Sequence, residues 1–96
     1  MRYVTITTWE LTEGVDFDLT LERMQATRLP ALKDLGADRV QIVRTSERTV
    51  AAISEWPDKA SRDTAAAMIE KVRGQLRSED HTKMTGEMLG EVVAEV

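Results

Sequence analysis

In the middle of the sequence, a strand leads directly into a long helix. The stretch Thr49–Trp56 (TVAAISEW) is rich in β-branched and small apolar residues, and Pro57 ends it because proline cannot donate to a β-ladder. Asp58 is the natural N-cap of a helix that we expect over Asp58–Arg77. The apolar positions of this helix recur at helical spacing: Ala65, Ile69, Val72 and Leu76. The strand and the helix therefore each have an apolar side to bury.

Two further strands are expected earlier in the chain. Tyr3–Leu11 alternates with period two and carries β-branched and aromatic residues, which is typical of a strand. Arg39–Thr45 (RVQIVRT) shows the same composition and is separated from Thr49 by a short polar turn. This spacing predicts a hairpin between the second and third strands.

A helix is expected between the first two strands. Its apolar residues Leu21, Met24, Leu32 and Leu35 recur at roughly helical intervals from Phe17 onward. Pro30 removes one helical hydrogen bond at a cost of about 3 kcal/mol or more, so we expect a kink or a break within Arg28–Leu32. Gly36 is well placed to end the helix in a left-handed conformation.

The end of the chain predicts a polar loop and a last strand. Ser78–Lys83 (SEDHTK) is the loop, and Met84–Val96 alternates as a strand. Gly86 and Gly90 within that strand indicate a bulge, or a point where another backbone comes close.

The order strand, helix, strand, strand, helix, strand is that of the split βαβ, ferredoxin-like fold. We therefore expect one α+β domain over residues 1–96, with a four-stranded antiparallel sheet. Right-handed crossovers would place both helices on the same face of this sheet. The other face then has no cover from within the chain.

All four predicted strands offer apolar residues to both sides. A sheet with one solvated face should instead alternate apolar and polar residues. At about 25 cal/mol per Å² of apolar surface, covering about 500 Å² of the second face is worth on the order of 10 kcal/mol, comparable to the stability of a whole domain. We therefore expect a homodimer with its sheets packed face to face; the alternative is a monomer whose long side chains fold over the second face.

Composition excludes several classes of function. The chain has no cysteine, so thiolate metal sites and thiol catalysis are excluded. The 13 basic and 17 acidic residues give a formal net charge of −4, which makes nucleic acid a poor partner. No apolar run approaches the roughly 20 residues of a membrane span, and the N-terminus lacks the apolar core of a signal peptide. We expect a cytoplasmic protein with no membrane partner.

Two passages resemble the dimeric α/β-barrel superfamily, in particular its antibiotic-biosynthesis-monooxygenase-like and small stress-responsive domains. They are AISEWPDKAS, which ends the third strand and begins the second helix, and RLPALKDLGADRVQIVR. The resemblance implies a homodimer with a small cavity between the helices and the sheet of each subunit. Its members include cofactor-independent oxygenases, haem-degrading oxygenases and proteins without known activity. The haem-degrading branch uses a first-strand asparagine, where this chain has Thr7, and a second-helix histidine, which Asp58–Arg77 lacks; haem degradation is therefore disfavoured.

Candidate ligand-binding residues come from both helices and from the sheet. The aromatic residues offer stacking surfaces and N–H or O–H contacts, although packing in the core or the dimer face is the commoner role of such residues. His81, the only histidine, is either a general base or a haem ligand near the cavity mouth, or a solvated loop histidine just past the helix C-terminus. Arg28, Arg44 and Arg48 are either carboxylate ligands or solvated surface residues. The expected pocket residues are Tyr3, Thr5, Thr7, Trp9, Met24, Trp56, Ile69, Val72 and His81.

The sequence contains no motif that identifies a catalytic residue, a metal site or a cofactor. We expect a small homodimeric protein that binds a small apolar or aromatic molecule without a cofactor. A cofactor-independent monooxygenase is the enzymatic interpretation. The alternative is a non-catalytic module for dimerisation or ligand sensing.

Overall fold

The computed structural model describes residues 1–80 and 82–96, with the side chains of residues 75–81 left undescribed. The elements follow the predicted order strand, helix, strand, strand, helix, strand. The first helical region consists of three consecutive pieces, α1, the π-helix η1 and α2. The bounds are β1 (Tyr3–Leu11), α1 (Phe17–Arg23), η1 (Met24–Arg28), α2 (Leu29–Asp34), β2 (Arg39–Ser46), β3 (Thr49–Trp56), α3 (Lys59–Asp80) and β4 (Thr82–Glu91).

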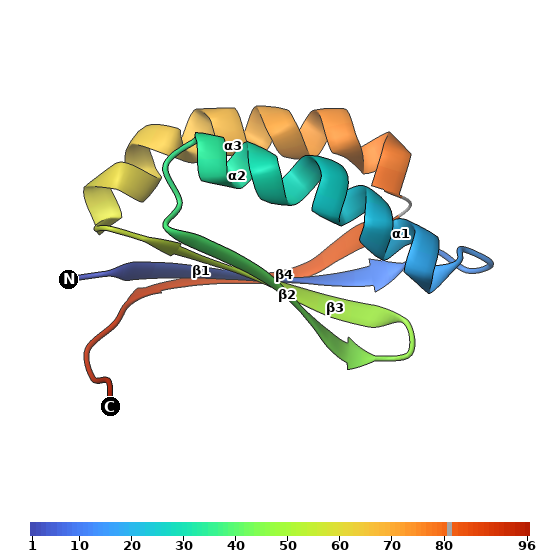
Figure 1. Ribbon diagram of the computed structural model, residues 1–96, viewed down its shortest axis with the longest axis horizontal. Coiled ribbons are helices and arrows are strands. Elements are labelled where there is room, and N and C mark those ends of the chain that lie inside the picture. The colour runs from blue at the N-terminus through green and yellow to red at the C-terminus, as the bar shows by residue number, and fades with distance from the viewer. Residues whose placement is uncertain (81) are drawn as a thin grey trace.

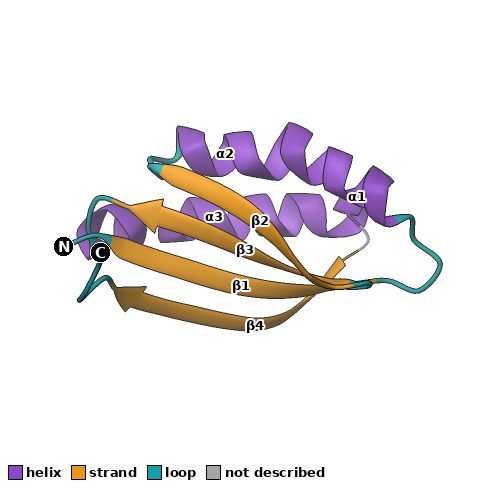
Figure 2. Ribbon diagram, turned by 60° about the horizontal axis from the view of Figure 1, so that its bottom comes forward, coloured by secondary structure: helices purple, strands orange, loops and turns teal. Residues whose placement is uncertain are grey.

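The four strands form one antiparallel sheet in the order β2-β3-β1-β4. Both helical regions lie on the same face of this sheet, and no helix or strand of the described residues covers the other face (Figure 1). Figure 2 shows the uncovered face with the four strands side by side in this order. The ferredoxin-like fold expected from the sequence is confirmed.

The first helical region is continuous, contrary to the kink or break expected near Pro30. Asp16 caps it, since its Oδ1 accepts the N–H of Asp18 at 2.9 Å. A regular α-helix would bring the ring of Pro30 against the carbonyl of Ala26. The wide turn of η1 lies at this place, so the chain passes the proline without breaking. Gly36 ends the region with φ of 113°, as predicted.

The helix α3 is longer than the sequence predicted. Asp58 caps it as expected, with its Oδ1 accepting the N–H of Ser61 at 2.7 Å. The helix continues through Asp80, and β4 begins at Thr82, so the loop predicted over Ser78–Lys83 is wrong for its described residues, which exclude His81. That stretch is polar but contains no glycine or proline, and polarity alone does not end a helix.

The last strand is displaced from its predicted position. It ends at Glu91, which pairs with Tyr3, the first residue of β1. Beyond this pair β1 has no strand residues left to pair with, and only the N–H of Val92 bonds to Arg2 O at 2.9 Å. The strand predicted as far as Val96 is therefore wrong in its final residues.

The predicted irregularity at Gly86 is confirmed. The register between β1 and β4 shifts between Thr8 and Trp9, which pair with Gly86 and Met84. A Cβ atom at Gly86 would lie 2.9 Å from the Thr8 hydroxyl oxygen. Glycine is therefore required here by the close approach of the neighbouring strand.

The core beneath the helices consists of two separate apolar clusters. One contains Tyr3, Ala37, Trp56, Ala65 and Ile69, with Leu32, Leu35 and Val40 packed against it. The other contains Trp9, Met24, Val50 and Ala52, with Phe17 and Ile42 beside it. The two clusters occupy opposite ends of the sheet, because Tyr3 and Trp9 lie near opposite ends of β1.

The uncovered face of the sheet carries apolar side chains. Ile6 of β1 lies between Ile53 of β3 and Met88 of β4 in the register of the sheet. Met88 is 62% exposed, and Val43 of β2 is also exposed on this face. This is the sheet face for which the strand sequences predict a partner.

Candidate functional site

A narrow cavity of about 30 Å³ lies between the sheet and the two helical regions. Its floor is formed by the middle of β1 and β3, and its roof by residues of η1, α2 and α3. The cavity lies between the two apolar clusters of the core, and both clusters contribute residues to its walls.

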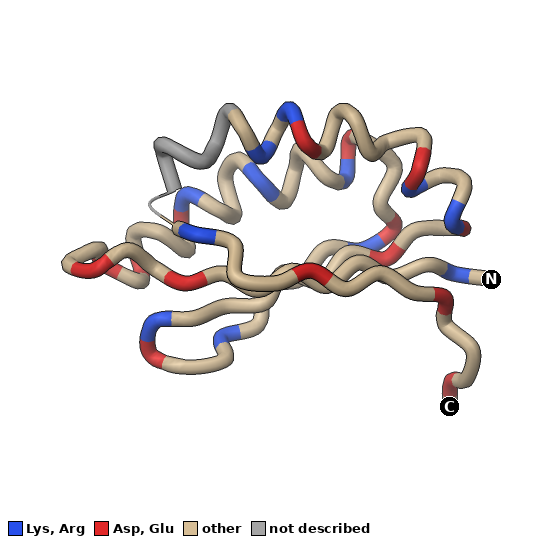
Figure 3. The backbone as a smooth tube through the Cα atoms, turned by 180° about the vertical axis from the view of Figure 1, so that it is seen from behind, with Lys and Arg blue, Asp and Glu red and all other residues tan. Residues whose placement is uncertain are grey.

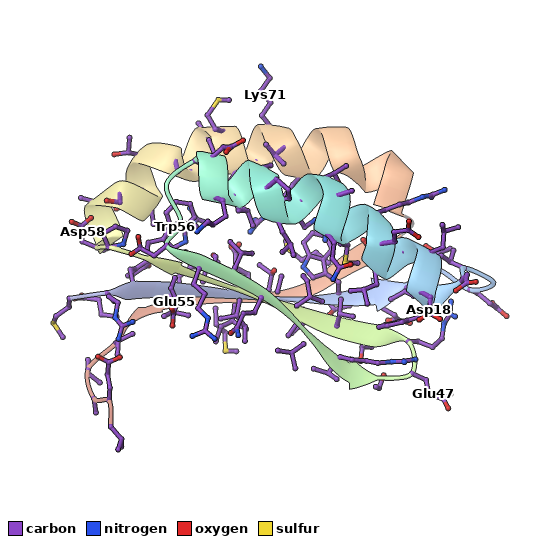
Figure 4. The ribbon with its side chains drawn as sticks, in the orientation of Figure 1. Asp18, Glu47, Glu55, Trp56, Asp58 and Lys71 are labelled. Atoms are coloured by element: carbon purple, nitrogen blue, oxygen red, sulfur yellow. The ribbon has the colours of Figure 1, made fainter. Side chains whose placement is uncertain are left out.

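The strand sequences explain why a space remains here. Along the helix-facing side of β1 the residues read Tyr3, Thr5, Thr7, Trp9, so small polar residues lie between two aromatic ones. The helix-facing residues of β3 are likewise small in the middle and end at Trp56, which is fully buried. Figure 4 shows the Trp56 side chain on the helix side of the sheet and that of its neighbour Glu55 on the other. The large side chains thus fill the ends of the core and leave its middle polar.

Both tryptophans direct their indole N–H groups toward this polar middle. Trp9 Nε1 donates to the hydroxyl of Thr7 at 2.8 Å, and Trp56 Nε1 donates to the hydroxyl of Ser54 at 3.0 Å. All four side chains are buried. Each hydroxyl therefore accepts one hydrogen bond and keeps its own proton to donate.

Arg62 extends from α3 toward the sheet and lines the same polar part of the cavity. Its Nε donates to the hydroxyl of Thr5 at 3.1 Å, and the arginine is only 6% exposed. With the residues that the structure describes, Arg62 makes this hydrogen bond and no ion pair. A nearly buried guanidinium thus rests against a neutral partner.

The acidic residues closest to Arg62 in sequence are bonded elsewhere. Asp58 accepts hydrogen bonds from the backbone and the side chain of Ser61, which lower the pKa of its carboxyl below the ordinary 3.8. Asp63 pairs with Lys59 at 2.7 Å and raises the pKa of that lysine. Neither carboxylate neutralises Arg62.

Two other arginines line the cavity. Arg28, the last residue of η1, is 4% exposed and lies over the Trp9 ring, 4.3 Å from the ring centre. Arg73 of α3 pairs with Glu70 at 3.0 Å and with Glu87 of β4 at 2.9 Å. Arg73 therefore ties the helix to the edge strand, whereas Arg28 and Arg62 lie beneath the helices.

The structure brings together some of the predicted pocket residues. Thr5, Thr7, Trp9, Ile69 and Val72 line the cavity, and their role in binding stays a prediction. The other described candidates, Tyr3, Met24 and Trp56, pack in the two clusters beside it. His81 lies outside the described residues.

The arginine candidates separate into two groups. Arg28 lies at the cavity. Arg44 lies 3.7 Å from the centre of the Phe17 ring, and Arg48 donates to the loop carbonyl of Val15 at 2.9 Å. Arg44 and Arg48 therefore act in local structure.

Sequence reasoning missed Arg62 and did not recognise how deeply Arg28 is buried. A signal for both was present in the helical spacing. Arg28 lies four residues after Met24 and four before Leu32, and Arg62 lies three before Ala65 and seven before Ile69. Both arginines thus occupy core positions in apolar stripes.

The described residues contain no group of three or more acidic or histidine residues that could hold a metal ion. No helix in the described part of the chain is long and apolar enough to cross a membrane. Charges of both signs are interspersed along the helices and at the turn between β2 and β3 (Figure 3).

Solved structures with the same fold are known. The chain matches a dimeric ferredoxin-like protein from an uncultured marine organism with a TM-score of 0.76 and 23% identity, over 99% of this chain and 98% of the other. It matches the protein YjcS with a TM-score of 0.69 and 12% identity, over 96% and 99%. SnoaB, a cofactor-independent oxygenase from Streptomyces nogalater, gives a TM-score of 0.65 and 16% identity, over 99% and 96%. No protein-family model and no curated protein matches the sequence. At these identities the likeness establishes the fold alone.

Proposed function

We propose that this chain forms a homodimer and binds a small aromatic molecule in the cavity of each subunit. The observation that carries the proposal is the cavity itself, a space with buried hydrogen-bonding groups between two tryptophan-containing clusters. Ligand sites are typically apolar clefts with a few convergent polar groups, and this cavity has that composition.

The proposed dimer packs two sheets together through their uncovered faces. Val4, Ile6 and Met88 line a shallow depression of about 270 Å³ on this face. A second copy of the sheet would remove these apolar side chains from water, which is the main driving force for association. The ferredoxin-like protein of known structure with 23% identity is described as dimeric, in agreement with this proposal.

The proposed ligand is aromatic because the cavity wall offers an aromatic surface beside hydrogen-bond donors. Trp9 supplies the face of its ring, while Ile69 and Val72 supply aliphatic contacts from α3. Stacked or edge-on aromatic pairs stabilise such contacts beyond the area that they bury.

A cofactor-independent oxygenase is the enzymatic form of this proposal. It is favoured by the fold shared with SnoaB. In a reaction of this class the substrate supplies the electrons, and O₂ provides one oxygen atom to the product while the other leaves as water. The described cavity residues include no carboxylate or imidazole that would act as a base. We therefore propose ligand binding first, with the oxygenase as its enzymatic form and a non-catalytic module for dimerisation or ligand sensing as the alternative. The expected cytoplasmic location stays a prediction.

Titration with 1-naphthol, followed by tryptophan fluorescence, tests the binding proposal. Ala52 lines the cavity and is buried, so Ala52→Leu should fill the space and abolish binding. Ala67→Leu adds the same side chain at an exposed position of α3 and should leave binding unchanged. If both variants give the circular dichroism spectrum of the wild type and bind 1-naphthol equally, the ligand lies elsewhere. Oxygen consumption that depends on the protein and is lost in Ala52→Leu would favour the enzyme.

A further inference from the structure

We propose that Arg62 binds the carboxylate of a small aromatic acid inside the cavity. This inference rests on the proposed function and specifies its ligand: an aromatic carboxylate in place of a neutral aromatic molecule. It follows from three features of the described residues, namely the charge of Arg62, the direction of the hydrogen bonds around it, and the shape of the space.

The first feature is the charge of Arg62. A guanidinium stays protonated in a protein, and removing it from water is costly unless an anion compensates it. Arg62 is 6% exposed, and its bond to Thr5 involves a neutral hydroxyl. Among the described residues no carboxylate lies within ion-pair distance of it. A ligand carboxylate would supply the missing negative charge.

The second feature is the direction of the hydrogen bonds. The hydroxyls of Thr5, Thr7 and Ser54 each accept an N–H group, from Arg62, Trp9 and Trp56 respectively. Each hydroxyl therefore has its proton left to donate, and within the described part of the chain these protons have no bonded acceptor. A group that only accepts hydrogen bonds fits such a site, and an ionised carboxylate is that group.

The third feature is the shape of the cavity. The cavity is narrow, and a flat carboxylate needs less room across its thin dimension than a tetrahedral phosphate or sulfonate. The planar guanidinium matches a carboxylate with two parallel hydrogen bonds. Trp9, Ile69 and Val72 lie along the same space and would contact the ring attached to the carboxylate.

Benzoate and benzamide test this inference, because they have nearly the same shape and only benzoate is charged. We expect wild-type protein to bind benzoate about tenfold more tightly than benzamide. A hydrogen bond between Arg62 and a charged carboxylate should contribute about this much more to the affinity than one to a neutral amide. Arg62→Gln should lose this preference while keeping its affinity for benzamide. Lys71→Gln removes the same charge from the outer side of α3, where Lys71 points away from the sheet (Figure 4), and should bind both as the wild type does.

The outcomes separate this inference from the proposed function. Benzamide binding as tightly as benzoate would overturn the inference and leave the aromatic site standing. Binding of neither compound, nor of 1-naphthol, would overturn the proposed function as well. If Arg62→Gln does not fold, Arg62→Lys replaces it, since lysine keeps the charge but lacks the planar fork. A reduced preference for benzoate in that variant supports the inference, and an unchanged preference overturns it.

Discussion

Arg62 Nε and the hydroxyl of Thr5 form a hydrogen bond of 3.1 Å across 57 residues of sequence. It joins the first turns of α3 to the middle of β1, at the polar gap between the two apolar clusters. Two elements distant in the chain are thus fixed to each other by a charged donor, which is a stronger link than a bond between neutral groups.

Replacing Thr5 by valine should destabilise the fold. The substitution keeps the shape of the side chain but leaves the Nε of a buried guanidinium without its acceptor, at an expected cost of about 1–3 kcal/mol. Urea unfolding of the two proteins measures this difference. Thr64→Val is the control, because the Thr64 hydroxyl bonds to Ala60 O on an exposed part of α3. An equal effect of both substitutions would contradict a special role for the Arg62–Thr5 bond.

Two methionines test the proposed dimer. Met88 is 62% exposed on the uncovered sheet face, and Met68 is 47% exposed on α3. We expect Met88→Asp to convert a dimer into monomers, because it places an unpaired charge in an apolar interface, while Met68→Asp stays dimeric. Sedimentation velocity at micromolar concentration distinguishes the two. A wild-type protein that sediments as a 10.8 kDa particle would refute the dimer.

Gly86 and Gly90 lie in the same strand and should respond oppositely to alanine. A Cβ at Gly86 meets the Thr8 hydroxyl oxygen at 2.9 Å, whereas a Cβ at Gly90 meets nothing within 4 Å. The Thr8 hydroxyl is also held by Thr85 at 2.9 Å, so it cannot move freely. We expect Gly86→Ala to cost about 1–3 kcal/mol of unfolding free energy, and Gly90→Ala to be neutral or stabilising by up to about 1 kcal/mol. Thr8→Ala combined with Gly86→Ala should recover part of the loss.

Asp58 makes the stability of the protein sensitive to acid. Its pKa is lowered in the folded state by hydrogen bonds from Ser61, so the carboxylate form favours folding. This contribution is fully present above the unfolded pKa and is lost as the pH falls through the lower, folded pKa. Asp58→Asn keeps a capping oxygen without a titrating group, so it should lose less stability than the wild type as the pH falls below the ordinary carboxyl pKa of 3.8. If chemical denaturation gives the wild type and Asp58→Asn the same dependence of unfolding free energy on pH, Asp58 is not the source of the acid sensitivity.

The sequence predicted the features of the fold that depend on local patterns. The β3 strand, the Asp58 cap, the left-handed Gly36 and the irregularity at Gly86 each follow from the residues at that place. The end of β4 at Glu91 could not be read in this way, because it depends on where its partner β1 begins. Pairing partners limit a strand as much as its own composition does.

The candidate site was predicted only in part for a related reason. Thr5, Thr7 and Trp9 stood out because alternation along one strand places them on one face. Arg28 and Arg62 were harder to place, since arginine is rarely buried and a solvated role is the usual one. Their burial depends on the small side chains of β1 and β3 opposite them, which is a property of the packed structure.

The wide turn η1 joins two parts of the first helical region that pack on different clusters. Phe17 of α1 and Met24, the first residue of η1, pack in the Trp9 cluster, whereas Leu32 and Leu35, which follow η1, pack against the Trp56 cluster. Removing one residue there would convert the wide turn into a regular α-turn and bring the ring of Pro30 against a carbonyl of the preceding turn. Gln25, Ala26 and Thr27 are exposed, so replacing their side chains should cost little, whereas removing one of these residues should strain the helix at Pro30.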